Sequence, residues 1–229
     1  MLVIVTSYQR PKYLWQTVAS LRQDDVKLCI VDGGSDPETR ARIRGMADCH
    51  ALLEGNPGAD VLKNTGIEQF AGKETEVMVT SDDLLFPQGY SALALKQYQR
   101  LNRFGLKWTF CACSMDYIEK WPPRPWLIHD GVEMLEVSTC QVSGALIDVA
   151  TWRKIGGFPV YGRSGQGDWA ISKRLRELKL RMCYFRNPCL KHLGATKWTD
   201  YPEYAREFER DEREFQGAAK KDATEQPKV

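Results

Sequence analysis

Apolar segments of strand length alternate with segments of helical periodicity through the first half of the chain. The apolar runs Leu2–Thr6, Lys27–Val31 and Glu76–Thr80 are short enough to be buried strands. Helical spacing begins at Pro11, after the first run, and returns over Val61–Phe70. Strands joined by helices in this way form a mostly parallel sheet with helices on both faces. We therefore expect an α/β fold.

The alternation continues, less regularly, in the second half. A proline-rich loop carrying Trp121 and Trp126 interrupts it. The elements that we predict here are a helix over Tyr90–Leu101, a strand over Lys107–Cys113, a strand over Val137–Ile147, a helix over Trp169–Leu180 and a strand over Met182–Phe185.

Composition restricts the class of protein. No apolar run approaches the roughly 20 residues that span a bilayer, and the amino terminus lacks a basic leader, so we expect no membrane span. The seven cysteines are an odd, scattered set, which favours a reducing compartment and a cytoplasmic location. The net charge is only +2, but Lys173 to Lys197 holds eight basic residues and one acidic residue, a candidate anion-binding surface or a solvated helix face.

Two adjacent carboxylates, Asp82 and Asp83, follow the strand that ends at Thr80. Ligands of α/β sheets lie at the carboxyl ends of strands. Neighbouring carboxylates repel each other, and such hard oxygen donors suit Mg²⁺ or Mn²⁺. We therefore predict a metal site that binds a diphosphate. The alternative is that one of the two caps a helix before Pro87.

Five short motifs follow one another in the chain. They are Thr6–Pro11 (TSYQRP), Asp32–Ser35 (DGGS), Lys63–Gly66 (KNTG), Thr80–Pro87 (TSDDLLFP), and Gly156–Phe158 (GGF) followed by Gly167–Asp168. In this order they resemble the motifs of GT-A-fold glycosyltransferases, most closely the inverting family-2 enzymes, over Leu2 to Leu193. The resemblance implies a Rossmann-like GT-A domain and transfer of a sugar from a nucleotide sugar, with UDP as the expected nucleotide, to a hydroxyl acceptor with inversion.

The resemblance also implies a domain organisation. We place a single GT-A domain at residues 1–199, with a nucleotide-binding half at 1–87 and an acceptor-binding half at 88–199. A charged C-terminal helix would follow at 200–217, and a polar tail at 218–229 is predicted to be disordered.

The resemblance assigns the donor site. Asp32 would accept a hydrogen bond from the uracil ring, although an aspartate beside two glycines also suits a simple turn. Asp82, Asp83 and His192 would bind Mn²⁺ or Mg²⁺, although an isolated histidine can equally be structural. The residues predicted to bind the nucleotide sugar are Thr6, Arg10, Asp32, Lys63, Asn64, Ser81 and Asp82.

Asp168 is the predicted general base, which would remove the proton of the acceptor hydroxyl. An aspartate at the start of a helix is also what capping predicts. Trp121, Trp126 and Trp169 are the predicted acceptor-binding residues, since flat aromatic rings suit sugars and bases. Two departures from the family pattern stand out. Thr80 replaces the first aspartate of its D-x-D motif, and Gly167 replaces the glutamate before the base.

The acceptor is left open between a glycan, a lipid-linked hydroxyl and DNA that carries hydroxymethylated pyrimidines. A nucleotidyltransferase is a second hypothesis, which we rank lower because Thr6–Pro11 contains no glycine for a phosphate loop. A catalytically inactive nucleotide-sugar-binding module is a third, which the departures at Thr80 and Gly167 keep open.

Overall fold

The computed structural model describes residues 1–103, 108–116, 125–160, 167–194 and 206. Its helices are α1 (Pro11–Leu21), α2 (Pro37–Met46), α3 (Ala59–Phe70), α4 (Tyr90–Asn102), α5 (Val149–Lys154) and α6 (Gly167–Glu177). Its strands are β1 (Leu2–Ser7), β2 (Lys27–Asp32), β3 (Cys49–Leu52), β4 (Glu76–Ser81), β5 (Leu84–Leu85), β6 (Trp108–Met115), β7 (Leu127–His129), β8 (Val132–Glu136), β9 (Ala145–Asp148) and β10 (Arg181–His192).

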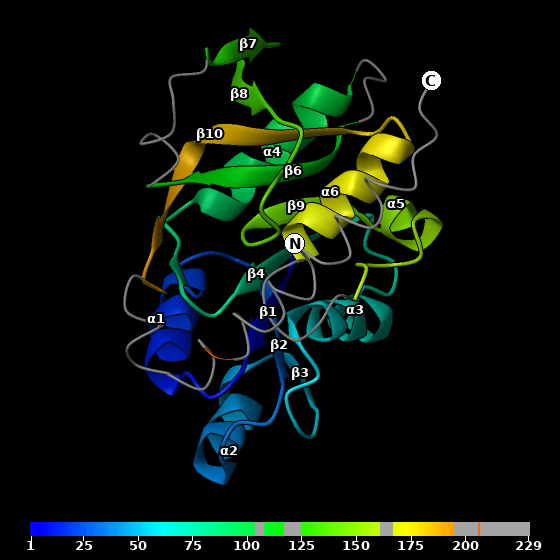
Figure 1. Cartoon of the computed structure of the whole chain (residues 1–229). Coiled ribbons are helices and arrows are strands. Elements are labelled where there is room, and N and C mark those ends of the chain that lie inside the picture. The colour runs from blue at the N-terminus through cyan, green and yellow to red at the C-terminus, as the bar shows by residue number, and fades with distance from the viewer. Residues whose placement is uncertain (104–107, 117–124, 161–166, 195–205, 207–229) are drawn as a thin grey trace, which may run out of the picture.

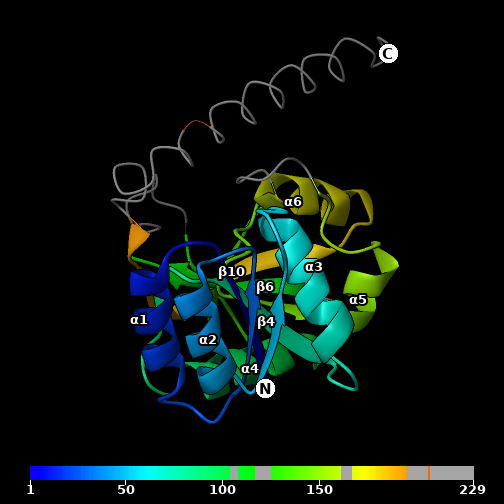
Figure 2. The same cartoon turned by 90° about the horizontal axis from the view of Figure 1, so that it is seen from below.

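The strands form one twisted sheet in the order β3-β2-β1-β4-β9-β6-β10-β8-β7, with β5 paired to β10. Strands β1 to β4 are parallel, and β6 and β10 run parallel to each other beyond the antiparallel strand β9. Helices α1, α2 and α4 lie on one side of the sheet, and α3, α5 and α6 on the other (Figures 1 and 2). The predicted α/β fold with a mostly parallel central sheet is confirmed.

The packing of α3 on the sheet depends on a glycine. A Cβ atom at Gly66 would lie 2.5 Å from Cγ2 of Ile4 and 3.1 Å from Cγ2 of Val31, both of which are fully buried. Real Cβ atoms do not approach so closely, so the glycine lets α3 lie directly on β1 and β2. The last residue of the KNTG motif therefore has a packing role.

The second half departs from the predicted elements. The stretch Val137–Ile147 is wrong as one strand, because residues 137–144 form a loop between β8 and β9. The hairpin of β7 and β8 was not predicted, and β10 is longer than the predicted Met182–Phe185. The predicted C-terminal helix at 200–217, apart from Arg206, and the tail at 218–229 lie outside the described residues.

Candidate active site

Asp82 and Asp83 lie where β4 ends, at the edge of the sheet where β1 and β2 also end. Both side chains are buried. Arg10, from the loop after β1, bridges them: Nη1 donates to Oδ2 of Asp83 at 3.0 Å, and Nη2 donates to Oδ1 of Asp82. Ser7 Oγ donates to Oδ2 of Asp82 at 2.8 Å. The mutual repulsion of the two carboxylates is thus offset by one guanidinium.

The two carboxylates differ in proton affinity. Burial raises the pKa of Asp82, because Arg10 offsets only part of the desolvation and Asp83 adds a like charge. Burial also opposes ionisation of Asp83, but the hydrogen bond with His192 and the charge of Arg10 outweigh it, so its pKa lies well below the ordinary value. Asp83 is therefore the more firmly ionised of the two and the stronger candidate ligand for a cation.

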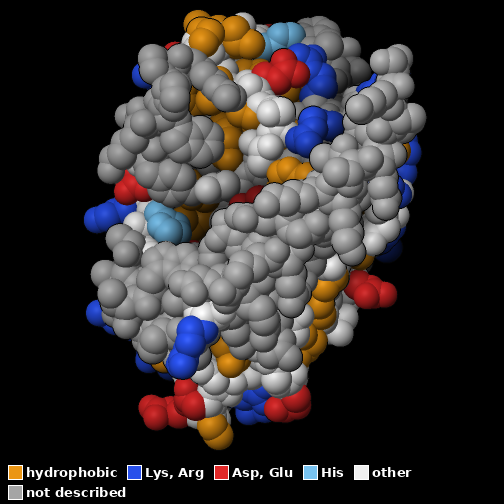
Figure 3. Space-filling model, in the orientation of Figure 1, with side chains coloured by type: hydrophobic (Ala, Val, Ile, Leu, Met, Phe, Trp, Pro, Cys, Tyr) orange, Lys and Arg blue, Asp and Glu red, His pale blue; other side chains and the backbone are white. Residues whose placement is uncertain are grey.

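The fold brings His192 to this pair from more than a hundred residues away. His192 ends β10, pairs with Leu84 of β5, and places Nε2 3.5 Å from Oδ2 of Asp83. The backbone N–H of Leu193 donates to the carbonyl of Asp83 at 2.8 Å. Figure 3 shows acidic side-chain atoms at the floor of a hollow near the middle of one face, with a histidine beside it.

The donor set fits a hard or borderline divalent cation. Among the described residues, no three His, Cys, Asp or Glu side chains converge as a complete metal cage. Mg²⁺ in nucleotide sites commonly takes only one or two carboxylates, and phosphate and water oxygens complete its shell. The carboxylate of Asp83 and the imidazole of His192 fit such a site, which the diphosphate would help to form.

Asp32 is held by its own turn. Its side chain is fully buried, and Oδ2 accepts from the N–H groups of Gly34 at 3.1 Å and Ser35 at 2.9 Å and from Nε of Arg40 at 3.2 Å. Oδ1 accepts from Ser35 Oγ at 2.5 Å. The next residue, Asp36, is the N-cap of α2, and its side chain accepts from the N–H of Thr39 at 2.9 Å. A base that bonded Asp32 would have to share an oxygen that already has a partner.

Two further residues that are predicted to bind the nucleotide sugar, Lys63 and Asn64, make contacts within the protein. Lys63 Nζ donates to Oδ1 of Asp60 at 3.0 Å, and both residues are buried. The amide of Asn64 donates to the carbonyl of Phe158 at 2.9 Å and accepts from Trp152 Nε1 at 3.1 Å and from the Phe158 N–H at 2.8 Å. Asn64 thus fastens α3 to the GGF segment.

Thr6, at the end of β1, is also predicted to bind the nucleotide sugar, and it is buried. Its hydroxyl donates to the carbonyl of Thr80 at 3.3 Å, across the β1–β4 pair. Thr80 stands in place of the first aspartate of the D-x-D motif, and it is fully buried.

Asp168 stands in the first turn of α6. Its Oδ1 accepts from the N–H of Val142 at 2.9 Å, in the loop that sequence patterns had assigned to a strand. In the same loop, Ser143 Oγ donates to Ser81 Oγ at 3.0 Å, and Ser81 in turn donates to Asp83. One loop thus contacts both the candidate base and the carboxylate pair, and the sequence offered no signal for Val142 or Ser143.

The tryptophans lie next to cations. Trp169 has the Lys173 ammonium 5.3 Å from its ring centroid, and Trp126 has the Arg186 guanidinium 5.7 Å from its ring centroid. Trp121 lies outside the described residues.

Three arginines of the basic stretch make contacts with other residues of the protein. Arg181 pairs with Glu136 at 3.0 Å, Arg186 pairs with Glu133 at 3.3 Å, and Arg176 donates to the carbonyl of Ser138. These contacts favour a structural role for the three arginines, and the charges of Arg181 and Arg186 are compensated by glutamates.

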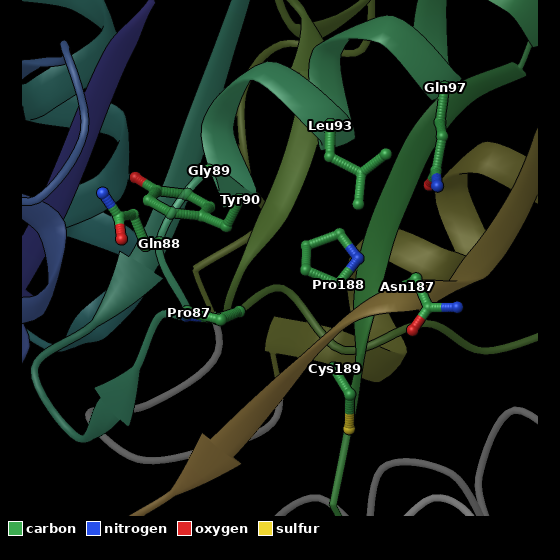
Figure 4. A pocket seen from close by; sticks show the side chains of 9 residues that line it. All are labelled: Pro87, Gln88, Gly89, Tyr90, Leu93, Gln97, Asn187, Pro188 and Cys189. Atoms are coloured by element: carbon green, nitrogen blue, oxygen red, sulfur yellow. The ribbon is translucent and has the colours of Figure 1, made fainter.

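A separate pocket of about 670 Å³ lies between the start of α4 and the middle of β10. Leu93 and Pro188 face each other across it (Figure 4). Its lining residues carry no formal charge, so it is not suited to a diphosphate. They are Pro87, Gln88, Gly89, Tyr90, Leu93, Gln97, Asn187, Pro188 and Cys189.

Comparisons with solved structures find proteins of similar fold. Similar solved structures include residues 1–349 of S. aureus TarS, with TM-score 0.61 and 14% identity over 87% of this chain and 62% of that chain. The same protein in complex with UDP gives TM-score 0.60 and 15% identity over 83% and 59%. GalNAc-T7 with UDP, GalNAc and Mn²⁺ gives TM-score 0.63 and 10% identity over 83% and 43%. At these identities the likeness establishes the fold.

The chain spans less than two thirds of the length of each of these structures. A comparison with curated protein sequences finds no match. The sequence profile of "Glycosyl transferase family 2", however, matches residues 2–144, more than half of the chain. The predicted resemblance is confirmed, and the protein belongs to glycosyl transferase family 2.

Proposed function

We propose that this protein transfers a sugar from a nucleotide sugar, with UDP as the nucleotide, to a hydroxyl acceptor with inversion, and that it uses Mn²⁺ or Mg²⁺. The observation that carries the proposal is the buried pair of Asp82 and Asp83, bridged by Arg10 and adjoined by His192, at the carboxyl edge of a family-2 fold. The UDP in the TarS complex, and the UDP and Mn²⁺ in the GalNAc-T7 complex, support the choice of donor and ion.

On the donor side, Asp83 and His192 would hold the ion. Once bound, it would offset the negative charge of the diphosphate as that group leaves. Asp82 is fully buried and keeps Arg10 in place through a charge-assisted hydrogen bond. Arg10 would contribute a fixed positive charge beside the phosphates, and Thr6 and Asp32 would contact the nucleoside.

On the acceptor side, residues 88–199 would contribute the base. The acceptor oxygen forms a bond to the anomeric carbon as the bond from that carbon to the phosphate oxygen breaks on the opposite face. The hydroxyl proton passes to the carboxylate of Asp168. The Val142 N–H fixes one oxygen of that carboxylate. Trp126 and Trp169, and Trp121 from outside the described residues, would contact the acceptor.

The acceptor would be a glycan, a lipid-linked hydroxyl or hydroxymethylated DNA. Among the described residues, no helix has both the length and the apolar character to cross a bilayer. In the described part of the basic stretch, Arg181 and Arg186 are paired with glutamates and do not favour DNA, so DNA enters the test as one acceptor among others.

The test is release of UDP from a panel of UDP-sugars with Mn²⁺ or Mg²⁺, with and without each acceptor class. We expect metal-dependent release that Asp82→Ala and Asp168→Asn both abolish. Binding of UDP without release from any donor would instead support an inactive binding module. Absence of UDP binding would contradict the proposal at the donor site.

A further inference from the structure

The start of α6 is occupied by a carboxylate that belongs to another helix. A Cβ atom built on Gly167 would lie 2.2 Å from Oδ1 and 2.3 Å from Oδ2 of Asp60. No side chain at position 167 can coexist with Asp60 in this place. The Asp60 carboxylate thus fills the space that a side chain at residue 167 would occupy.

Asp60 is well fixed there. It lies in the first turn of α3, next to α6 in Figure 2, and is 7% exposed. Lys63, one turn further along α3, donates to its Oδ1 at 3.0 Å. A buried ion pair is costly to form and contributes little net stability, so its usual benefit is a defined arrangement of the groups around it.

Gly167 is also the position at which this chain departs from the family pattern, which has a glutamate before the general base. We propose that Asp60 supplies from α3 the acidic group that this chain lacks at residue 167, and that it acts as a positioning residue for Asp168. The inference rests on the proposed function, because it gives Asp60 a part in the transfer reaction.

Asp60 would act on the start of α6 in two ways. The carboxylate packs against the first residue of α6, so it restrains the backbone that carries Asp168. The ion pair with Lys63 holds the carboxylate in this place, so the restraint on α6 depends on the charge of Asp60 as well as on its size. Both effects act on the chemical step and leave binding of UDP unchanged.

The experiment moves the carboxylate from one helix to the other. The variants are Asp60→Gly, Gly167→Glu, the double variant D60G/G167E and its neutral counterpart D60G/G167Q. Each is measured for turnover, for the KM of the UDP-sugar, for UDP affinity and for Tm. We expect Asp60→Gly to lower kcat at least tenfold with an unchanged KM for the donor, and Gly167→Glu alone to lower Tm by roughly 5 °C through the clash with Asp60.

The double variants decide the role of the charge. Relative to Asp60→Gly, D60G/G167E should regain at least half of the kcat and of the Tm that this single variant loses. D60G/G167Q, whose side chain has the same size, should regain neither, because Lys63 remains without an anionic partner. Equal rescue by both would reduce the contact to packing and overturn the proposal, as would rescue by neither. If the unaltered protein transfers no sugar, the proposed function fails. The Tm comparison of the two double variants would then still decide whether residues 60 and 167 share one carboxylate position.

Discussion

The two ends of the candidate site are built differently. Asp82 and Asp83 are buried and are held by the opposite charge of Arg10 and by side chains from β1 and β10. Asp168 is held by a backbone N–H of a loop, through Val142. The described contacts of the donor end are thus mostly between charged side chains, whereas the described contact of the Asp168 carboxylate is with a backbone N–H. Removing a charge should damage the donor end. The acceptor end should respond most to a change that alters the chemistry of the Asp168 carboxylate.

The largest expected effect separates the two ends by function. Asp168→Asn retains the size of the side chain and removes the base, so kcat should fall by about 10²- to 10⁴-fold. UDP affinity should stay within about twofold, because this substitution leaves Asp83 and His192 intact. Steady-state kinetics and calorimetry measure the two quantities. A parallel loss of UDP affinity would show that the ends are not separate.

Arg10→Gln tests the role of charge at the donor end. Without the guanidinium, two buried carboxylates face each other, and the free energy of unfolding should fall by about 3 kcal/mol in the presence of EDTA. Saturating Mn²⁺ should restore part of the loss, because an ion held by Asp83 and His192 would offset part of the negative charge. Denaturant unfolding with EDTA and with Mn²⁺ provides the measurement.

Arg22→Gln is the matched control for that experiment. Arg22 pairs with Asp48 at 2.9 Å, but both side chains are more than a third exposed. The control should change stability by less than about 1 kcal/mol and should not respond to Mn²⁺. If the two variants behave alike, the charge of Arg10 does not organise the donor end.

Gly66→Ala tests the packing that supports the donor end. The added methyl would lie 2.5 Å from Ile4, and overpacking of this kind costs about 1–3 kcal/mol. Gly45→Ala in α2 meets nothing within 4 Å and should stabilise by up to about 1 kcal/mol. Thermal unfolding of both variants gives the comparison, and a neutral result for Gly66→Ala would contradict the close contact of α3 with β1.

The smallest effect lies away from both ends, at Asp24. Burial would raise the pKa of Asp24, but hydrogen bonds from the Ser91 backbone and hydroxyl and from the Gly89 N–H outweigh it, so the pKa is lowered. A lowered pKa means that this stabilisation is present above the unfolded value of about 3.9 and is lost as the pH falls through the folded pKa. Asp24→Asn should therefore lower Tm at pH 7 and have little effect near pH 2. A Tm difference that is the same at both pH values would contradict this assignment.

Much of the donor end could be predicted from the sequence. An apolar strand followed at once by two carboxylates predicted the positions of Asp82 and Asp83, and parallel strands bring such ends together. The prediction of His192 beside the pair came from the resemblance, and the structure places it 3.5 Å from Asp83. What the sequence could not show is that Asp32 is already fully bonded, since that depends on Arg40 from a neighbouring helix.

The acceptor end was less predictable for a physical reason. Residues 137–144 are predicted as part of a strand, yet in the structure they form a loop whose Val142 and Ser143 connect Asp168 to Ser81. The contact of Asp60 with Gly167 joins residues more than a hundred positions apart. Such contacts follow from the packing of α3 against α6 and leave no periodic pattern in the chain.

The most direct test of a charge-organised donor site is calorimetric titration of UDP with and without Mn²⁺, for the unaltered protein and for Asp83→Asn. Mn²⁺ should raise UDP affinity at least tenfold in the unaltered protein and have no effect in the variant, because Asp83 is the ionised carboxylate beside His192. UDP affinity that is independent of Mn²⁺, or equally enhanced in the variant, would contradict the assignment of Asp83 as the ligand that couples the ion to the diphosphate.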